Sequence, residues 1–238
     1  MKAERVVLTP AYLLHQRAWR ETSKLLEVWS REHGRIGLVA RGARRPNSPQ
    51  RSLLQPFTPL LMSWTQRGEM GNLGAVESAG APTLLRGRPL MAAFYMNELL
   101  LRMVARQDAH PSLHDVYART LHALAGDKPA AALRMFELQL LAALGYGLSL
   151  DRVAGSGARV EAGEDYLYDL EAGPRLAAGR KGPGVPIRGR TLLALHGGTL
   201  DDAGDLKDAK RLLAAALEPH FQGRALKTSG VMRALARR

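Results

Sequence analysis

A single change in the spacing of apolar residues, near Pro82, constrains the fold of this chain more than any other feature of its sequence. Before it, short β-rich runs such as 25–29 and 60–64 are separated by turn-forming residues, and helical spacing is missing. After it, apolar residues recur three and four positions apart, as in helices that bury one face. The sequence therefore predicts an α+β multidomain protein, with a strand-rich part followed by a mostly α-helical part.

Residues 1–79 are expected to form a small closed β-barrel. In the segment 34–42, alternation places Ile36, Leu38 and Ala40 on one face of a strand, and Arg35 and Arg41 on the other. About five short strands fit this length, whereas a sandwich usually needs about seven strands and about 100 residues. An OB-fold suits these numbers best.

The helical domain is expected to comprise residues 80–147 and 199–238 on either side of an insert. Four stretches carry the helical spacing, at 90–103, 113–124, 133–144 and 206–217. The insert, residues 148–198, is rich in Gly and Pro and has one short β-like run at 166–170. We expect it to be irregular.

The bulk composition restricts the partners and the compartment. Lys plus Arg number 34 against 22 Asp plus Glu, a net charge of +12, which favours a polyanionic partner unless the source proteome is simply rich in arginine. The absence of cysteine excludes disulfides, thiolate nucleophiles and thiolate zinc sites. No window approaches the roughly 18 consecutive apolar residues of a membrane span, and the start lacks the apolar core of a secretory signal. We expect a cytoplasmic, nucleoid-associated protein with no membrane partner.

Positive charge is concentrated in the predicted barrel. Between Arg31 and Arg51 there are six arginines, opposed only by Glu32. The loop 41–51 is rich in Gly, Pro and Ser, which predicts a mobile basic arm that does not pack, and the alternative is an ordinary solvated loop. The residues expected to bind DNA phosphates are Lys24, Arg35, Arg41, Arg44, Arg45 and Arg51.

The three tryptophans, Trp19, Trp29 and Trp64, all fall in the predicted barrel. Exposed rings on such barrels stack on bases, each stack contributing roughly 1–3 kcal/mol. The alternative is that a barrel of this size needs its tryptophans for the core. The sequence leaves both open for each ring.

Signatures of catalysis are weak. No GxxxxGK[ST] phosphate loop occurs. His110 and His114 are four apart, as two metal ligands on one helix face would be, but Pro111 makes the first a poor helical residue. Four acids could suggest a metal cluster: Asp201, Asp202, Asp205 and Asp208. They precede a predicted helix, however, and the positive end of a helix attracts carboxylates without any metal. We expect helix capping there, no catalytic residue and no enzymatic activity.

Several segments, in order, resemble the RecO family of bacterial DNA repair proteins. Those similar to its N-terminal barrel are 19–23, 34–44 and 54–60, and those similar to its helical domain are 95–100, 133–141, 144–147 and 209–220. Together they extend over nearly the whole chain. The resemblance implies an N-terminal OB-fold, a helical domain and an inserted segment.

The resemblance also implies a function and partners. The chain would be a non-catalytic recombination mediator that binds single-stranded and double-stranded DNA, anneals complementary strands, and helps load RecA on DNA coated by single-strand binding protein (SSB), with RecR as a partner. Many members carry a four-cysteine zinc module at about 148–198. This chain has no cysteine, so we expect neither zinc nor another cofactor.

Members of that family also bind the acidic, apolar C-terminal tail of SSB on the helical domain. Arg134 stands where the family pattern has a basic contact to that tail. A guanidinium beside a hydrophobic groove suits such a peptide chemically. The alternative is that Arg134 is a solvent-facing helix residue.

The sequence leaves three functions open. In the first, the basic residues of the barrel neutralise the phosphates of two strands so that they pair. The second is an RNA-binding or ribosome-associated OB-fold protein, indicated by a preference for structured RNA. The third is a magnesium-dependent nuclease that uses Asp201 and Asp202.

Overall fold

The structure is a computed structural model that describes residues 4–179, 182–221 and 223–228. It consists of two compact units, one within Met1–Ala125 and Leu226–Arg238, the other within Gly126–Ala225. This division falls inside the expected helical domain and does not test the expected boundaries at residues 79 and 147, which stay predictions. Each unit is described by itself below.

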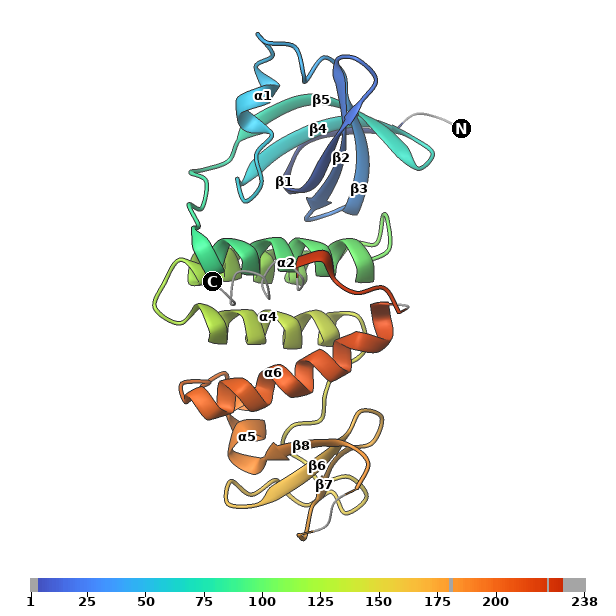
Figure 1. The fold of residues 1–238 in the computed structure, drawn as a ribbon. Helices are drawn as coiled ribbons and strands as arrows, with labels where there is room; N and C mark the ends of the chain where they lie inside the picture. Colours follow the sequence, from blue (N-terminus) through green and yellow to red (C-terminus); the bar gives the residue numbers. More distant parts are fainter. Residues whose placement is uncertain (1–3, 180–181, 222, 229–238) are drawn as a thin grey trace. The chain divides into compact units, whose positions relative to one another are not determined.

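The first unit contains a closed five-stranded barrel with strand order β1-β2-β3-β5-β4 (Figure 1). Its strands are β1 (Glu4–Trp19), β2 (Ser23–Ser30), β3 (Gly34–Ala40), β4 (Leu60–Arg67) and β5 (Met70–Ser78). Every pairing is antiparallel except that of β3 with β5. This is the OB-fold arrangement, and it confirms the predicted fold class.

Alternation along the strands fills the barrel. The register of β2 with β3 pairs Leu26 with Leu38 and Val28 with Ile36, and all four are at most 3% exposed. Two register shifts in β1, at Val6/Thr9 and Leu13/His15, bend this long strand so that it pairs with both β2 and β4. The face predicted from alternation, with Ile36 inward, is confirmed.

The loop after β3 is structured. Its backbone forms successive turns, with Arg45 N donating to Gly42 O and Ser48 N to Arg45 O, and it runs into α1 (Gln50–Leu53). Ala43 is fully buried in the barrel core. The expectation that this loop does not pack is therefore wrong, because one small apolar side chain fills the core while its charged neighbours remain exposed.

Polar contacts tie two helices of the first unit to the barrel. These helices are α2 (Gly87–Met103) and α3 (Pro111–Leu124), which confirm the first two helical stretches. Asn97 of α2 donates to Leu14 O at 2.9 Å and accepts a 2.6 Å hydrogen bond from the Tyr117 hydroxyl of α3. Buried hydrogen bonds of this kind fix the orientation of helices more tightly than apolar contact alone.

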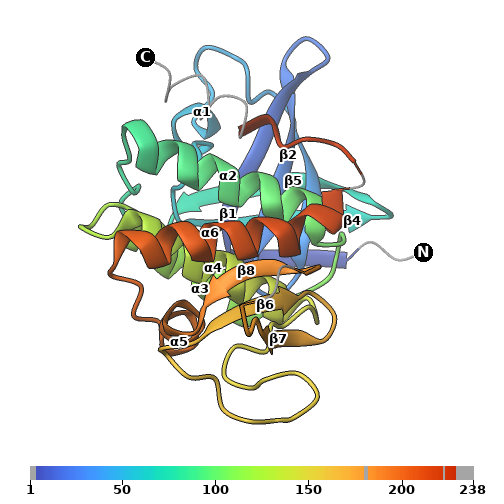
Figure 2. The same cartoon turned by 60° about the horizontal axis from the view of Figure 1, so that its bottom comes forward.

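The second unit combines helices with a small sheet. Its elements are α4 (Pro129–Ala143), β6 (Asp165–Asp169), β7 (Gly173–Leu176), β8 (Val185–Arg188), α5 (Gly189–Gly197), α6 (Ala203–Leu217) and the 3-10 helix η1 (Glu218–Phe221). The sheet order is β7-β6-β8, and α6 packs against β8 and α5 (Figure 2).

The insert is more regular than the sequence indicated. Its strands are four or five residues long, too short for alternation to be recognised, although Tyr166 and Tyr168 both point inward and are at most 2% exposed. Pro174 and Pro186 lie in the edge strands, where a missing N–H is tolerated.

None of the helices in the described residues combines the length and the apolar character that a membrane crossing requires.

Candidate nucleic-acid interface

Two adjoining hollows lie on the outer face of β1, β2 and β3. The first, of about 560 Å³, is lined by Trp19, Arg20, Thr22, Ser23, Val39, Arg41, Gly42, Arg45 and Asn72. The second, of about 410 Å³, is lined by His15, Arg17, Trp19, Leu25, Leu26, Glu27, Val39, Met70 and Arg106. They share Trp19 and Val39 and so form one continuous surface. We call the part of this surface formed by Trp19 and four arginines, Arg17, Arg20, Arg41 and Arg45, the Trp19 face.

Trp19 is the exposed ring of this face. Trp19 is 39% exposed, and the guanidinium carbons of Arg17 and Arg20 lie 5.9 and 6.0 Å from the centroid of its ring. Cation–π contacts of exposed groups contribute about 0.5–1 kcal/mol each. The ring is thus flanked by positive charge and open to a flat ligand.

The other two tryptophans are buried. Trp29 is 0% exposed and its ring stacks on His114 of α3, with centroids 6.4 Å apart. Trp64 is 2% exposed and points into the barrel core. Of the two alternatives left open by the sequence, the core role therefore holds for Trp29 and Trp64, whereas Trp19 keeps the exposed surface that stacking needs.

The loop after β3 brings two predicted cations to the Trp19 face. Arg41 and Arg45 are exposed and line the first hollow. Gly42 between them has φ +70°, a conformation that side-chain-bearing residues rarely adopt, and it turns the chain back there. Arg44 is exposed and braces the β1–β2 turn, because its Nη1 donates to Arg20 O at 3.0 Å and its backbone N to Thr22 O at 2.9 Å.

Lys24 lies close enough to Arg44 and Arg51 to feel the positive charge of each. Burial, followed by the charges of Arg51 and Arg44, lowers the pKa of the Lys24 ammonium. Lys24 Nζ also donates to Gln16 Oε1 at 2.8 Å. The structure thus places a second small group of predicted cations near Arg44. Together these cations create a positive potential that would attract an anion.

Arg35 is held differently from the other predicted cations. Its Nη1 donates to Leu101 O of α2, and burial lowers the pKa of its guanidinium. Arg35 therefore joins β3 to α2, and phosphate contact by this residue stays a prediction that the observed geometry does not favour.

Sequence reasoning missed Arg17, Arg20 and Arg106. Arg17 and Arg20 precede the arginine-rich stretch on which the charge count was centred. Alternation offered a signal, since Arg17 and Trp19 are two apart in one strand and share a face. Arg106 comes from the connection after α2, and its Nη2 pairs with Glu27, the one acid among the described residues that line the two hollows.

Arg134 lies on α4 in the second unit. Its side chain is 10% exposed, and its Nη2 lies 2.9 Å from Glu137 Oε1, on a side chain that is 1% exposed. The alternative that Arg134 faces solvent is therefore wrong. It belongs to a buried ion pair, of the kind that is strongly destabilising to break.

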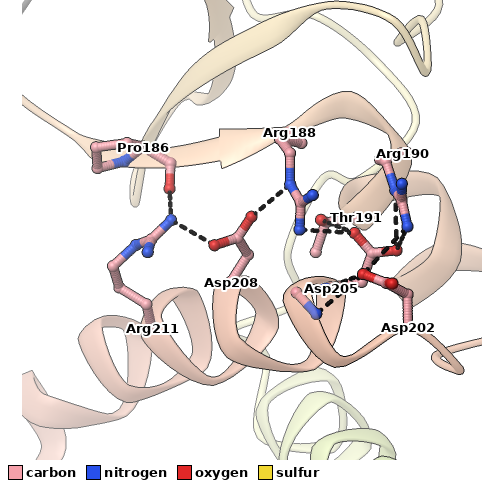
Figure 3. Close-up of polar contacts among 9 residues, drawn as sticks. Pro186, Arg188, Arg190, Thr191, Asp202, Asp205, Asp208 and Arg211 are labelled. Atoms are coloured by element: carbon pink, nitrogen blue, oxygen red, sulfur yellow. Dashed lines mark hydrogen bonds and ion pairs between the residues drawn. The ribbon is translucent and has the colours of Figure 1, made fainter.

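Arginines pair with Asp202, just before α6, and with Asp205 and Asp208 within it (Figure 3). Asp202 caps α6, accepting from the backbone N of residues 204 and 205 at 2.9 and 3.0 Å, as expected. Asp205 accepts from Arg190 at 2.8 Å and from the Thr191 hydroxyl at 2.6 Å. Burial acts to raise the pKa of Asp205, but these hydrogen bonds and the positive charges of Arg190 and Arg188 outweigh it and lower that pKa.

The residues of the insert do not fit the zinc module that the resemblance implies. Its sequence has no thiolate donor. Asp208, the next acid on α6, is paired with Arg188 at 2.8 Å and with Arg211 at 2.9 Å. Among the described residues no three His, Asp or Glu side chains come together as metal ligands. The second unit is therefore crosslinked by ion pairs at the place where α5, α6 and β8 meet.

The five-stranded barrel and its order make this an OB-fold protein. Residues 1–81 match the family model "Recombination protein O N terminal", and residues 86–230 match "Recombination protein O C terminal". The chain belongs to the RecO family of DNA repair proteins, which confirms the resemblance.

Three similar proteins align with this chain over nearly their whole length. The "DNA repair protein RecO" of Nitrosococcus oceani is 47% identical over 98% of this chain and 95% of the relative. That of Alkalilimnicola ehrlichii is 48% identical over 100% and 95%. That of Methylococcus capsulatus is 45% identical over 96% and 94%.

Proposed function

We propose that this chain is a non-catalytic, nucleoid-associated recombination mediator that binds single-stranded DNA on the Trp19 face and anneals complementary strands. The observation that carries the proposal is an exposed tryptophan flanked by arginines on the outer face of an OB-fold barrel. OB-folds that bind single strands combine a positively charged groove with such stacking rings. Membership of a family of DNA repair proteins supports the same class of ligand.

Annealing on this surface needs no active site. Arg41 and Arg45 would contact successive phosphates while the Trp19 ring stacks on a base. Two strands whose phosphates are neutralised repel each other less, and base pairing then supplies the free energy of annealing. Duplex DNA would bind through the same phosphate contacts, but without the base stack. The reaction breaks and forms no covalent bond, so no cofactor is needed.

The mediator step involves proteins as well as DNA. By its resemblance to the family, the chain would receive the acidic tail of SSB at Arg134, act with RecR, and so help RecA to load on the uncovered strand. Arg134 is now paired with Glu137. A tail carboxylate would have to replace Glu137 as its partner, and the high charge density of such a tail makes that exchange reasonable.

The test compares annealing of bare and SSB-coated complementary strands. Replacing Arg41, Arg44 and Arg45 together by Ala should abolish annealing on both substrates. Arg134→Glu should abolish it only on coated DNA. Because this change also breaks the buried pair with Glu137, the same test is made with Arg134→Met and Glu137→Leu together, and thermal unfolding checks that the second unit has folded.

Three outcomes would overturn the proposal. Failure of the natural protein to anneal bare strands would remove the annealing function. Tighter binding of a structured RNA than of an oligodeoxythymidine would favour the RNA-binding alternative instead. Cleavage of a strand in magnesium that is lost in the Asp202→Asn variant would show that the protein is an enzyme.

A further inference from the structure

Lys24 lies where the inward-facing side of β2 reaches the end of the barrel. Side chains alternate along a strand, so Lys24 faces the same way as the buried Leu26, two positions further on. Its partners in the neighbouring strands are Ala18 of β1 and Ala40 of β3, and Ala40 is fully buried. The side chain of Lys24 therefore starts at the edge of an apolar core, and the residue is half-buried.

The hydrogen-bond partner of the Lys24 ammonium is neutral. Its Nζ donates to Gln16 Oε1 at 2.8 Å, and Gln16 Nε2 in turn donates to Leu54 O at 3.2 Å. Burial, and then the positive charges of Arg51 and Arg44, lower the pKa of the Lys24 ammonium. A lysine that is desolvated and flanked by cations holds more of the neutral amine, which is the form that attacks a carbonyl carbon.

The two neighbouring arginines are open to solvent. Arg44 is fixed beside the start of β2, because its backbone N donates to Thr22 O at 2.9 Å and its Nη1 to Arg20 O at 3.0 Å. Arg51 lies in the last turn of α1. Both arginines are exposed, so their guanidinium groups can receive an anion, and guanidinium groups bind phosphate well. An activated amine thus stands beside groups that bind phosphate.

We propose that Lys24 is an acylation site that reacts with small acyl phosphates, with Arg44 and Arg51 holding the phosphate while the amine takes the acyl group. The Nζ lone pair attacks the carbonyl carbon and forms a C–N bond. The C–O bond to the phosphate breaks, and its electron pair leaves with inorganic phosphate. Nζ then releases a proton to water and an amide remains. The acyl phosphate supplies both the acyl group and the leaving group, so no further reactant is needed.

Acylation would regulate strand binding, an effect that rests on the proposed function. The amide carries no charge, so the reaction removes one of the cations expected to bind phosphate. If Lys24 contributes one phosphate contact, its acylation should make the slope of log K against log salt shallower by about 0.7.

The test is brief treatment with acetyl phosphate, followed by peptide mass spectrometry at a low extent of reaction. Lys24 should be acetylated before Lys128, whose side chain is 67% exposed and whose Nζ pairs with Asp201 at 2.6 Å. Exposure alone predicts the opposite order, because Lys128 is the more accessible of the two. Arg51→Gln, at an exposed position, should slow acetylation of Lys24 and leave that of Lys128 unchanged.

The matched control is Lys24→Arg, which keeps the positive charge and has no amine to acylate. Treatment should weaken binding of an oligodeoxythymidine by the natural protein and not by Lys24→Arg, each compared with its own untreated sample. Acetylation of Lys128 before Lys24, or an unchanged rate at Lys24 in Arg51→Gln, would overturn the acylation site. Equal loss of binding by both treated proteins would overturn its effect on the strand. Failure of the untreated natural protein to bind would instead contradict the proposed function, because the mass measurement involves no DNA.

Discussion

Replacing Trp19 by Ala tests whether the Trp19 face stacks on bases. A base stacked on an aromatic ring contributes roughly 1–3 kcal/mol, so the variant should bind an oligodeoxythymidine roughly fivefold to 150-fold more weakly. Because Trp19 is 39% exposed and lies outside the barrel core, the substitution should change the free energy of unfolding far less than it changes binding. The measurement is fluorescence anisotropy of the labelled strand, with thermal unfolding as the check on the fold.

The dependence of binding on salt separates stacking from charge. Each phosphate contact on single strands contributes about −0.7 to the slope of log K against log salt. Arg41→Ala with Arg45→Ala should therefore make the slope shallower by about 1.4, if each contacts one phosphate. Trp19→Ala removes no charge and should leave the slope unchanged while it weakens binding at every salt concentration.

Intrinsic fluorescence gives an independent reading of the same contact. Trp29 and Trp64 are buried, so quenching of tryptophan emission by an oligodeoxythymidine should come from Trp19 and disappear in Trp19→Phe. Undiminished affinity in Trp19→Ala, or quenching that persists in Trp19→Phe, would refute the assignment of this ring to base stacking.

Three further predictions concern stability. Asp205→Asn should destabilise the second unit by about 1–3 kcal/mol in urea unfolding, because the buried side chain at this position loses its charge-assisted hydrogen bonds with Arg190. Folding lowers the pKa of Asp205, so the stability contributed by its carboxylate is present above the unfolded pKa of 3.8 and is lost as the pH falls through the lower folded pKa. If Asp205→Asn lost stability at acid pH just as the natural protein does, this assignment would be contradicted. Arg134→Met should be tolerated better when Glu137→Leu accompanies it than alone, and a thermal double-mutant cycle measures the difference; additive effects would show that the pair does not interact. Burial lowers the pKa of His114, so the stability of its neutral ring is complete above the unfolded value of 6.5 and declines as the pH falls toward the folded value. His114→Phe should remove that decline between pH 6.5 and 5 in thermal unfolding, and a decline that survives would assign it to another group.

Much of the fold follows from short-range patterns. The partial alternation that sets Ile36, Leu38 and Ala40 on the face opposite Arg35 specifies a half-buried strand. The helical spacing after Pro82 specifies helices such as α2 and α3. Proline at the first turn of α3, at Pro111, and of α4, at Pro129, marks where these helices begin. The expected cap at Asp202 was also readable, because an acid before a helix satisfies its unpaired N–H groups.

Only some residues of the candidate site could be predicted from the sequence. The concentration of arginine in the loop after β3 was visible, and Arg41 and Arg45 do reach the Trp19 face. Arg17 and Arg20 join them because β1 pairs with β2 in a register that brings Trp19 opposite Ser23. That register depends on turns and bulges as well as on alternation, and the bulge in β1 left no clear mark in the sequence.

Local patterns in the chain decide which residues share a face, whereas packing between distant segments decides which of those faces are covered. Trp19 and Trp29 both point outward from the barrel, but His114 of α3 covers Trp29 and leaves Trp19 open. Arg134 sits on a helix at a position that reads as ordinary surface, yet it is buried beside Glu137. The physical reason is that alternation and helical spacing are local, whereas burial depends on contacts between residues far apart in the chain.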